Sequence, residues 1–187
     1  MENHNNKIHH HFMKDTSYKL MVNFDEFELR KYTPATVLEI VAIGSRTNAL
    51  IKAKRKLLAL IEQNKKILIN ESASNRSIPE ILIEPLAKRN EWKFIFFLEN
   101  NDLPLSVFQK RITMSNQPEK HYGTVRVIGL MSNEKIVQKI LLLKSWLAKE
   151  KLLIVGKPKI AMYKSYWNIA FLKRVEIYIE VEPSVKN

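Results

Sequence analysis

The chain contains no cysteine among its 187 residues. This absence excludes disulfide bonds, thiolate-bound zinc or iron–sulfur centres, and any thiol nucleophile. Glycine is scarce as well, with four residues, and neither the GxGxxG nor the GxxxxGK(S/T) loop that holds nucleotide phosphates occurs. The GxSxG and HExxH signatures of hydrolases and metalloproteases are also missing. We therefore expect neither a metal site nor a catalytic group of these kinds.

Long apolar runs are absent too. Apolar stretches such as residues 94–98 and 152–155 are far shorter than the roughly 18 residues that a membrane-spanning helix needs. Residues 1–17 are rich in asparagine, histidine and lysine and lack the apolar centre of a secretory signal. We therefore expect a cytoplasmic protein without a membrane span, in which residues 1–17 form a disordered polar tail and residues 18–187 form a single domain.

Positive charge dominates the composition, with 31 Lys and Arg against 19 Asp and Glu and a formal net charge of +12. Such a charge attracts anionic partners, among them nucleic acid, acidic membrane surfaces and ligands that carry carboxylates. The basic segment 52–56 has no aromatic side chain among its charges, whereas proteins that bind single-stranded nucleic acid combine the two. We therefore expect no specific nucleic acid partner and interpret this segment as a solvated helix face.

Hydrophobic periodicity predicts strands and one helix in the first half of the chain. Residues 36–43 carry apolar side chains on both faces, which is typical of a covered strand. Residues 45–63 place apolar side chains at helical spacing, which predicts an amphipathic helix. A short polar turn joins strand-like segments at 80–87 and 91–98, so we expect a hairpin there.

The second half follows the same order. A strand is predicted at 122–129 and a helix at 131–150, with Ser132 as its N-cap. Further strands are predicted at 159–164 and 174–182. The last of these alternates cleanly between apolar and polar residues, which predicts one core face and one solvent-exposed face.

A glycine stands between strand and helix in each half. Gly44 and Gly129 lie about 85 positions apart, which indicates two copies of one strand–helix–strand unit. Two such units would pair as a single antiparallel sheet or open barrel with two helices against it. The predicted fold is therefore α+β, with pseudo-twofold symmetry.

Few individual side chains indicate a catalytic or metal-binding role. Four of the five histidines lie in the polar tail, and His121 stands alone. Glu39 and Glu84 are carboxyl groups within apolar strands, where burial would raise a carboxyl pKa, although an outward-facing position is the simpler interpretation.

A more distinctive segment, residues 163–174, combines aromatic and cationic side chains. Trp167 and Phe171, together with Lys173 and Arg174, would suit a flat, apolar ligand that carries carboxylates. Alternatively, the two aromatic side chains close one end of the barrel.

Two regions of the sequence resemble a known family. Residues 27–32 read Phe-Glu-Leu-Arg-Lys-Tyr and resemble the FE(I/L)RxY opening of the SOUL haem-binding protein family. Residues 161–163, Trp167 and residues 171–176 are similar to that family's closing pattern, P–AxY–PPW–PFxRRNEVxIxV. The resemblance extends from about residue 18 to residue 182, although the prolines around Trp167 are not kept.

The resemblance implies a twisted eight-stranded antiparallel β-barrel flanked by two helices, similar to the effector-binding domains of multidrug-responsive regulators. It also implies non-enzymatic binding of haem or another tetrapyrrole in a hydrophobic groove. Because the chain has no histidine between His11 and His121, this binding would occur without an axial histidine. Two alternatives stay open: a module that binds or senses other flat hydrophobic molecules, and a small-molecule hydrolase on the same barrel. A glutamate–tyrosine pair that lines the cavity would favour the hydrolase.

The family's proposed pocket lies between the first helix and the loop before the last strand. Carried over to this sequence, basic side chains would face propionates and apolar side chains would face the macrocycle. The implied ligand-binding residues are Ile51, Lys54, Leu58, Trp167, Phe171, Lys173 and Arg174.

Overall fold

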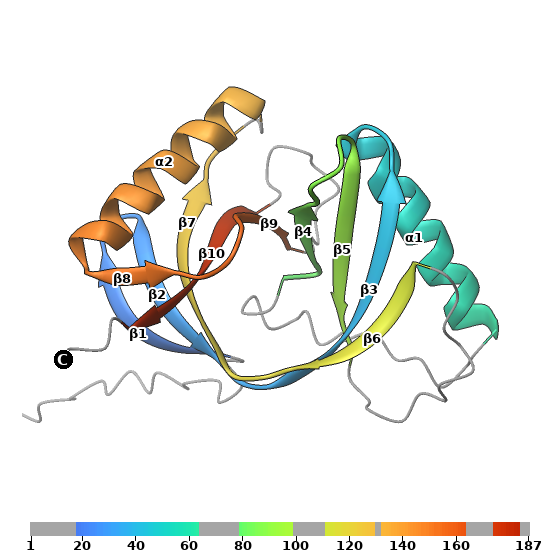
Figure 1. The fold of residues 1–187 in the computed structure, drawn as a ribbon, viewed down its shortest axis with the longest axis horizontal. Helices are drawn as coiled ribbons and strands as arrows, with labels where there is room; N and C mark the ends of the chain where they lie inside the picture. The colour runs from blue at the N-terminus through green and yellow to red at the C-terminus, as the bar shows by residue number, and fades with distance from the viewer. Residues whose placement is uncertain (1–17, 64–78, 99–110, 130–131, 164–173, 184–187) are drawn as a thin grey trace, which may run out of the picture.

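The computed structural model describes residues 18–63, 79–98, 111–129, 132–163 and 174–183, so the predicted tail lies outside the described residues. Within this part, ten strands form one antiparallel sheet and two helices pack on it (Figure 1). In chain order the elements are β1 (Tyr18–Phe24), β2 (Phe27–Tyr32), β3 (Ala35–Ile43), α1 (Arg46–Gln63), β4 (Ile81–Pro85), β5 (Glu91–Phe97), β6 (Ile112–Gln117), β7 (Lys120–Val127), α2 (Asn133–Lys149), β8 (Leu152–Ile154), β9 (Lys159–Met162) and β10 (Val175–Pro183).

The strand order reveals a duplicated unit. It runs β1-β2-β7-β10-β9-β4-β5-β3-β6, with β8 beside β10, and the pairings are antiparallel. At the centre β4 pairs with β9, where Leu82 faces Ala161. On one side of this pair follow β5, β3 and β6, and on the other side their equivalents β10, β7 and β2. The predicted α+β fold, made of two copies of one unit with a helix in each, is therefore confirmed.

The two copies together contribute eight strands, as the family resemblance implies, and β1 and β8 are additional. Strand β1 forms a hairpin with β2, and the three-residue β8 pairs with the end of β10. Among the described strands the path begins at β1 and ends at β6 without a pairing between them. The sheet is thus strongly curved and open along this path.

Two long curved segments, each made of two consecutive strands, connect the two halves of the sheet. Strand β2 continues into β3 after residues 33–34, and β6 continues into β7 after residues 118–119. Strand β2 pairs with β7, and β6 pairs with β3. Each sequence repeat therefore supplies one strand to the half of the sheet that is formed mainly by the other repeat. The two continuous ribbons cross below the centre of the sheet in Figure 1.

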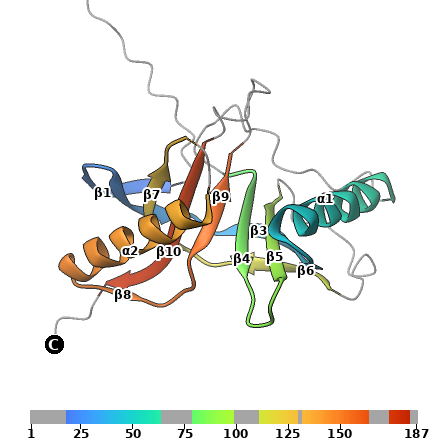
Figure 2. The same ribbon diagram turned by 90° about the horizontal axis from the view of Figure 1, so that it is seen from above.

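The helices cover one face of the sheet. Helix α1 packs on β3 and β5, and α2 packs on β7, β8 and β10, as Figure 2 shows from above. Alternate strand residues point into this core, for example Ile40 towards α1 and Ile177 towards α2. Helix α2 begins as predicted, since the Ser132 hydroxyl accepts a hydrogen bond from the Lys135 backbone N–H at 3.2 Å. No helix within the described ranges is long and apolar enough to cross a bilayer.

The opposite face of the sheet is also buried in its centre. We predicted that the polar face of the last strand would be exposed to solvent, and this prediction is wrong for β10. Glu176 and Tyr178 on that face are 2% and 1% exposed. The reason is tertiary, because β2 and β9 bring Arg30 and Tyr163 alongside them. This face therefore holds polar groups that are satisfied within the protein rather than by water.

A substitution at Gly123 tests the packing between β7 and α2. A methyl group at this position would lie 2.5 Å from Leu147 Cδ2, and the Leu147 side chain is fully buried. We expect Gly123→Ala to lower the free energy of unfolding by about 1–3 kcal/mol, because overpacking displaces neighbours. Urea denaturation measures the loss. With Leu147→Ala added, the combined loss should be smaller than the sum of the single losses. Strict additivity would contradict the predicted contact.

Candidate functional site

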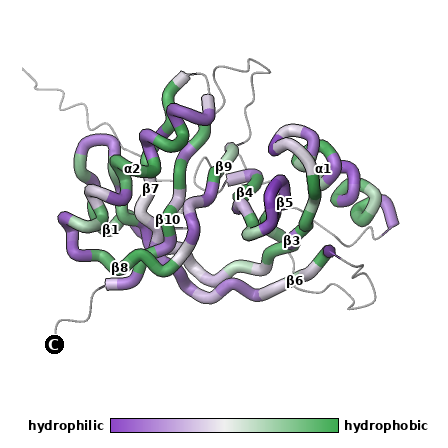
Figure 3. Tube along the Cα trace, turned by 45° about the horizontal axis from the view of Figure 1, so that its top comes forward, coloured by the Kyte–Doolittle hydropathy of each residue, from purple (hydrophilic) through white to green (hydrophobic). Residues whose placement is uncertain are grey.

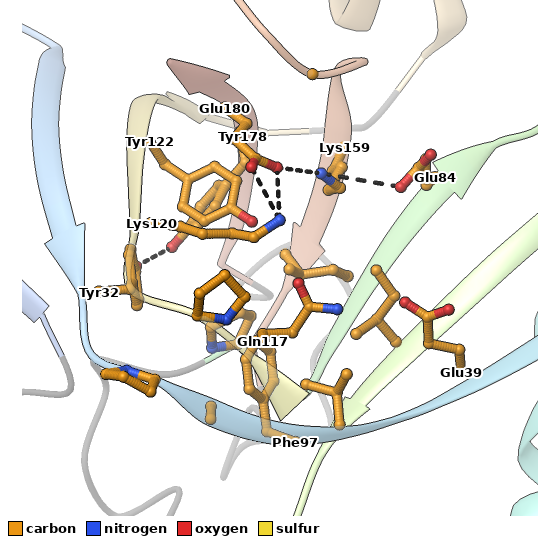
Figure 4. Close-up of a pocket in the computed structure, with 18 of the residues that line it drawn as sticks. Tyr32, Glu39, Glu84, Phe97, Gln117, Lys120, Tyr122, Lys159, Tyr178 and Glu180 are labelled. Carbon is orange, nitrogen blue, oxygen red and sulfur yellow. Dashed lines mark hydrogen bonds and ion pairs between the residues drawn. The ribbon is translucent and has the colours of Figure 1, made fainter. Parts of the chain in front are cut away.

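A cavity of about 740 Å³ lies on the sheet face opposite the helices, between the two halves (Figure 4). The segments where the long strands cross, residues 32–37 and 117–122, contribute to its wall. Side chains from β4, β5, β9 and β10 complete much of it. The volume is in the range of about 300–1,000 Å³ that is usual for small-molecule sites.

Apolar and aromatic side chains line part of the cavity. Those of the first half include Val37, Leu82, Ile95, Phe97 and Leu98. Three tyrosine rings, those of Tyr32, Tyr122 and Tyr178, line the opposite part, with centroids 5.4–5.9 Å apart. Such surfaces favour a ligand with a flat apolar body.

Charged side chains of the cavity connect the two halves of the sheet. Glu180 on β10 lies 2.8 Å from the Lys120 Nζ and 3.4 Å from the Lys159 Nζ. Lys159 also lies 3.8 Å from Glu84 on β4, so its ammonium group connects both halves. Burial would raise the pKa of Glu180, but the hydrogen bonds and charges of the two lysines outweigh it and lower the pKa. Glu180 is therefore ionised at neutral pH.

Lys93 extends this row of charges into the first half. Its Nζ lies 3.8 Å from Glu39 and 3.9 Å from Glu84. These distances exceed hydrogen-bonding range, as does the distance from Lys159 to Glu84. A carboxylate of a ligand that enters the cavity could therefore bind Lys93 or Lys159 without first breaking a direct hydrogen bond to Glu84.

A second polar cluster, which we call the Glu176 network, adjoins the cavity. Arg30 Nη1 donates to Glu176 Oε2 at 2.7 Å and to the Tyr178 hydroxyl at 2.9 Å. Arg174 Nε donates to Glu176 Oε1 at 2.7 Å. Arg30 and Glu176 are each 2% exposed. Burial would raise the pKa of Glu176, but the two arginines outweigh it and lower the pKa, so the carboxylate is ionised.

The ionised carboxylate sets the direction of the hydrogen bonds among the tyrosines. Glu176 can only accept, so the Tyr163 hydroxyl donates to it at 2.9 Å. Tyr178 then donates to Tyr163 at 2.5 Å, and Tyr32 donates to Tyr178 at 2.6 Å. Burial is the largest cause that raises the pKa of all three tyrosines. Their hydroxyls therefore stay protonated, and the rings of Tyr32 and Tyr178 are held against the cavity.

The structure places four of the seven predicted ligand-binding residues away from this cavity. Ile51 and Leu58 lie on the outer surface of α1, 46% and 57% exposed, and Lys54 pairs with Glu80 at 2.8 Å. The Arg174 guanidinium belongs to the Glu176 network and lies over the Tyr163 ring at 4.3 Å. None of these four residues lines the cavity. The remaining three, Trp167, Phe171 and Lys173, lie outside the described residues.

Sequence reasoning did not collect the residues that line the cavity, although it noted Glu39 and Glu84. The signal that would have found more of them is a charged residue in the middle of an apolar strand. Lys93 in β5 and Glu180 in β10 share this property with those two glutamates. The described residues include no group of three or more His, Cys, Asp or Glu side chains that could hold a metal ion.

Comparisons with known proteins agree with this architecture. The model of the SOUL heme-binding protein family matches residues 13–180. The crystal structure of the EcmrR C-terminal domain is similar, with a TM-score of 0.65, 15% identity, and coverage of 88% of this chain and 98% of that one. A hydrolase from Listeria innocua is also similar, with a TM-score of 0.57, 12% identity, and coverage of 84% and 92%. At these identities the two structures show a shared fold. No curated protein sequence matches the chain.

Replacement of Glu176 tests the network. We expect Glu176→Gln to lower the free energy of unfolding at neutral pH by about 1.5–3 kcal/mol, because Arg30 and Arg174 lose their hydrogen bonds to a charged carboxylate, while Arg30 keeps its ion pair with Glu28. Folding lowers the pKa of Glu176, so its stabilisation is present above the ordinary glutamate pKa and is lost as the pH falls through the folded-state pKa. The difference between wild type and variant in urea titrations should therefore shrink in acid.

Glu119→Gln is the matched control, because Glu119 forms an exposed ion pair with Lys31. Exposed pairs contribute little to stability, so this variant should unfold nearly as the wild type does. Equal losses for the two variants would contradict the stabilising role of the Glu176 network.

Proposed function

The chain belongs to the SOUL haem-binding protein family, and from this membership and the cavity between its halves we propose that it binds haem or another tetrapyrrole reversibly and without catalysis. The observation that carries the proposal is the composition of the cavity wall. It combines apolar side chains, tyrosine rings and lysines in one cavity. A tetrapyrrole such as haem combines the matching features, since it is flat, largely apolar and carries propionate groups.

The apolar wall suits the macrocycle. Leu82, Ile95 and Phe97 offer aliphatic and aromatic surface on one side, and Tyr32 and Tyr178 offer rings on the other. Because the Glu176 network holds the two tyrosine hydroxyls, these rings would not need to be ordered when the ligand binds. Such pre-organisation lowers the entropic cost of binding.

The lysines suit the propionates. Lys93 and Lys159 make only long contacts with Glu84, and Lys120 lies at the same wall. A hydrogen bond between an ammonium group and a carboxylate is roughly twice as strong as one between neutral groups. Two propionates could therefore orient the ring in the cavity.

Ligation of the iron is not part of the proposal. The described residues that line the cavity include no histidine, cysteine or methionine. Tyr32, Tyr122 and Tyr178 have raised pKa values, first of all because they are buried, so the phenolate that binds ferric iron is disfavoured. The residues present thus fit the macrocycle and its carboxylates rather than the metal.

The position of the pocket has two candidates. The central cavity is supported by its volume and lining. The helix–loop site, which comprises Ile51, Lys54, Leu58, Trp167, Phe171, Lys173 and Arg174, is supported by the family resemblance. It stays a prediction, because three of its members lie outside the described residues.

Comparison of haemin with iron-free protoporphyrin IX tests the binding mode. We expect similar affinities, because contacts to the macrocycle and propionates are common to both. His121→Ala should change neither affinity, since His121 does not line the cavity. Absorbance and tryptophan-quenching titrations measure both ligands. A much tighter haemin complex that His121→Ala weakens would show iron ligation and contradict the proposal. If neither ring binds below about 100 μM, which corresponds to about −5.5 kcal/mol, the tetrapyrrole function is wrong.

Paired substitutions locate the site. In the central cavity, Lys93→Gln should weaken protoporphyrin IX binding about tenfold or more, because a hydrogen bond to a charged group contributes about 1.5–3 kcal/mol. Lys54→Gln with Lys173→Gln removes two of the three cations of the helix–loop site, leaves Arg174 in the Glu176 network, and should leave the affinity unchanged. The reverse outcome would place the ligand in the helix–loop site instead. Equal effects of both variants would point to non-specific attraction by the net charge.

A second candidate function rests on a glutamate–tyrosine pair. Glu180 and Tyr122 are cross-strand partners, and both line the cavity. Glu180 is ionised, whereas burial and then the Glu180 charge raise the pKa of Tyr122, which keeps its proton. A base beside a proton donor is the minimum that hydrolysis of a small molecule requires. Release of a cleaved product from a panel of esters and lactones, abolished by Glu180→Gln, would favour a hydrolase. Recovery of all compounds intact would favour a binding protein.

A further inference from the structure

A separate hollow of about 300 Å³ lies beside α1 and shares no residue with the central cavity. Its wall comes from the end of β3, from one flank of α1 and from the residue that precedes β6. The described residues that line it are Val41, Ala42, Ile43, Lys52, Arg55, Lys56 and Arg111. The hollow therefore has a largely apolar surface, with three strand residues at its base and four cationic side chains around it.

The charged side chains around this hollow are all positive. In the central cavity each of three lysines lies within 4 Å of a glutamate, as the ion pairs there show. Around the hollow, by contrast, no lining residue is acidic. Lys52 donates to the Ile43 carbonyl at 2.9 Å, which holds its ammonium group at the rim. Like charges gathered without an acid attract an anion, and a phosphate group has enough oxygen atoms to accept hydrogen bonds from several cations at once.

Exposed aliphatic side chains flank the cations. Ile43 at the end of β3 is 44% exposed, and Ile51 and Leu58 are 46% and 57% exposed on α1. On the helix, Ile51, Arg55 and Leu58 follow one another at spacings of four and three, so they share one face. Figure 3 shows the resulting mixture of hydrophilic and hydrophobic positions along α1, at the outer edge of the molecule.

We propose that this hollow binds the phosphate of an anionic phospholipid headgroup, with α1 lying against the membrane surface. A free phosphorylated metabolite would need only the cations. A lipid surface supplies phosphate and acyl chains together, which fits cations that alternate with exposed aliphatic side chains. The proposal is independent of tetrapyrrole binding, because Arg55 and Lys56 belong to neither candidate pocket.

Sedimentation of the full chain with vesicles tests the proposal. We expect the chain to sediment with vesicles of equal amounts of phosphatidylglycerol and phosphatidylcholine, and not with phosphatidylcholine alone. Arg55→Gln with Lys56→Gln should weaken the partition coefficient about thirtyfold, because each basic side chain near an anionic surface contributes about 1 kcal/mol. Leu58→Gln should weaken it as well, since it removes apolar surface without changing charge. Protoporphyrin IX affinity should stay unchanged in the Arg55 and Lys56 variant.

Lys19→Gln with Lys144→Gln is the matched control, because both lysines are exposed on β1 and α2 and the change in net charge is the same. An equal loss of vesicle binding in this control would overturn the proposal, since it would show attraction by net charge alone. Binding of glycerol phosphate in solution, dependent on Arg55 and Lys56 but without vesicle binding, would overturn the lipid source. Failure to sediment with either kind of vesicle, without such binding, would overturn the site.

Discussion

The buried carboxylate of Glu176 is the group on which the arrangement of the second half depends. It lies on β10 and takes hydrogen bonds from Arg30 on β2, from Tyr163 after β9 and from Arg174. A buried charge without partners would cost several kcal/mol, so these segments must stay together for the chain to remain folded. The network also orients Tyr178 and Tyr32, whose rings line the cavity. Stability and the shape of the site thus have a common origin.

Equivalent positions of the two halves of the duplicated fold are chemically different. Leu82 and Ala161 face each other at the pseudo-twofold axis, and their partners on the next strands are Ile95 and Glu176. Ile95 in the first half is therefore the equivalent of Glu176 in the second half. Two residues further along each strand, Phe97 is the equivalent of Tyr178. At these two positions the first half is apolar where the second half is polar. Across the cavity as a whole both halves contribute apolar and charged side chains, which favours a ligand that has both kinds of surface.

The excess of positive charge is not spread evenly over the molecule. The lysines of the central cavity have glutamates within 4 Å, so their positive charge is largely compensated inside the cavity. The hollow beside α1 has cations without an acid in its wall, and it lies on the outer surface. Two anions of different chemistry, one on a small molecule and one on a large surface, would therefore be attracted to different parts of the fold.

Local patterns in the sequence were enough to predict both helices, the Ser132 cap, most strands and the duplication, because periodicity and capping depend on near neighbours. The motif at residues 27–32 and the closing pattern within residues 161–176 together indicated the family. The site was not predictable in this way. Arg30 and Glu176 are 146 positions apart, and each alone looks like a polar residue on an exposed strand face. Which faces are buried depends on how β2 and β6 cross to the opposite halves, and such long-range pairing leaves no periodic signal in the chain.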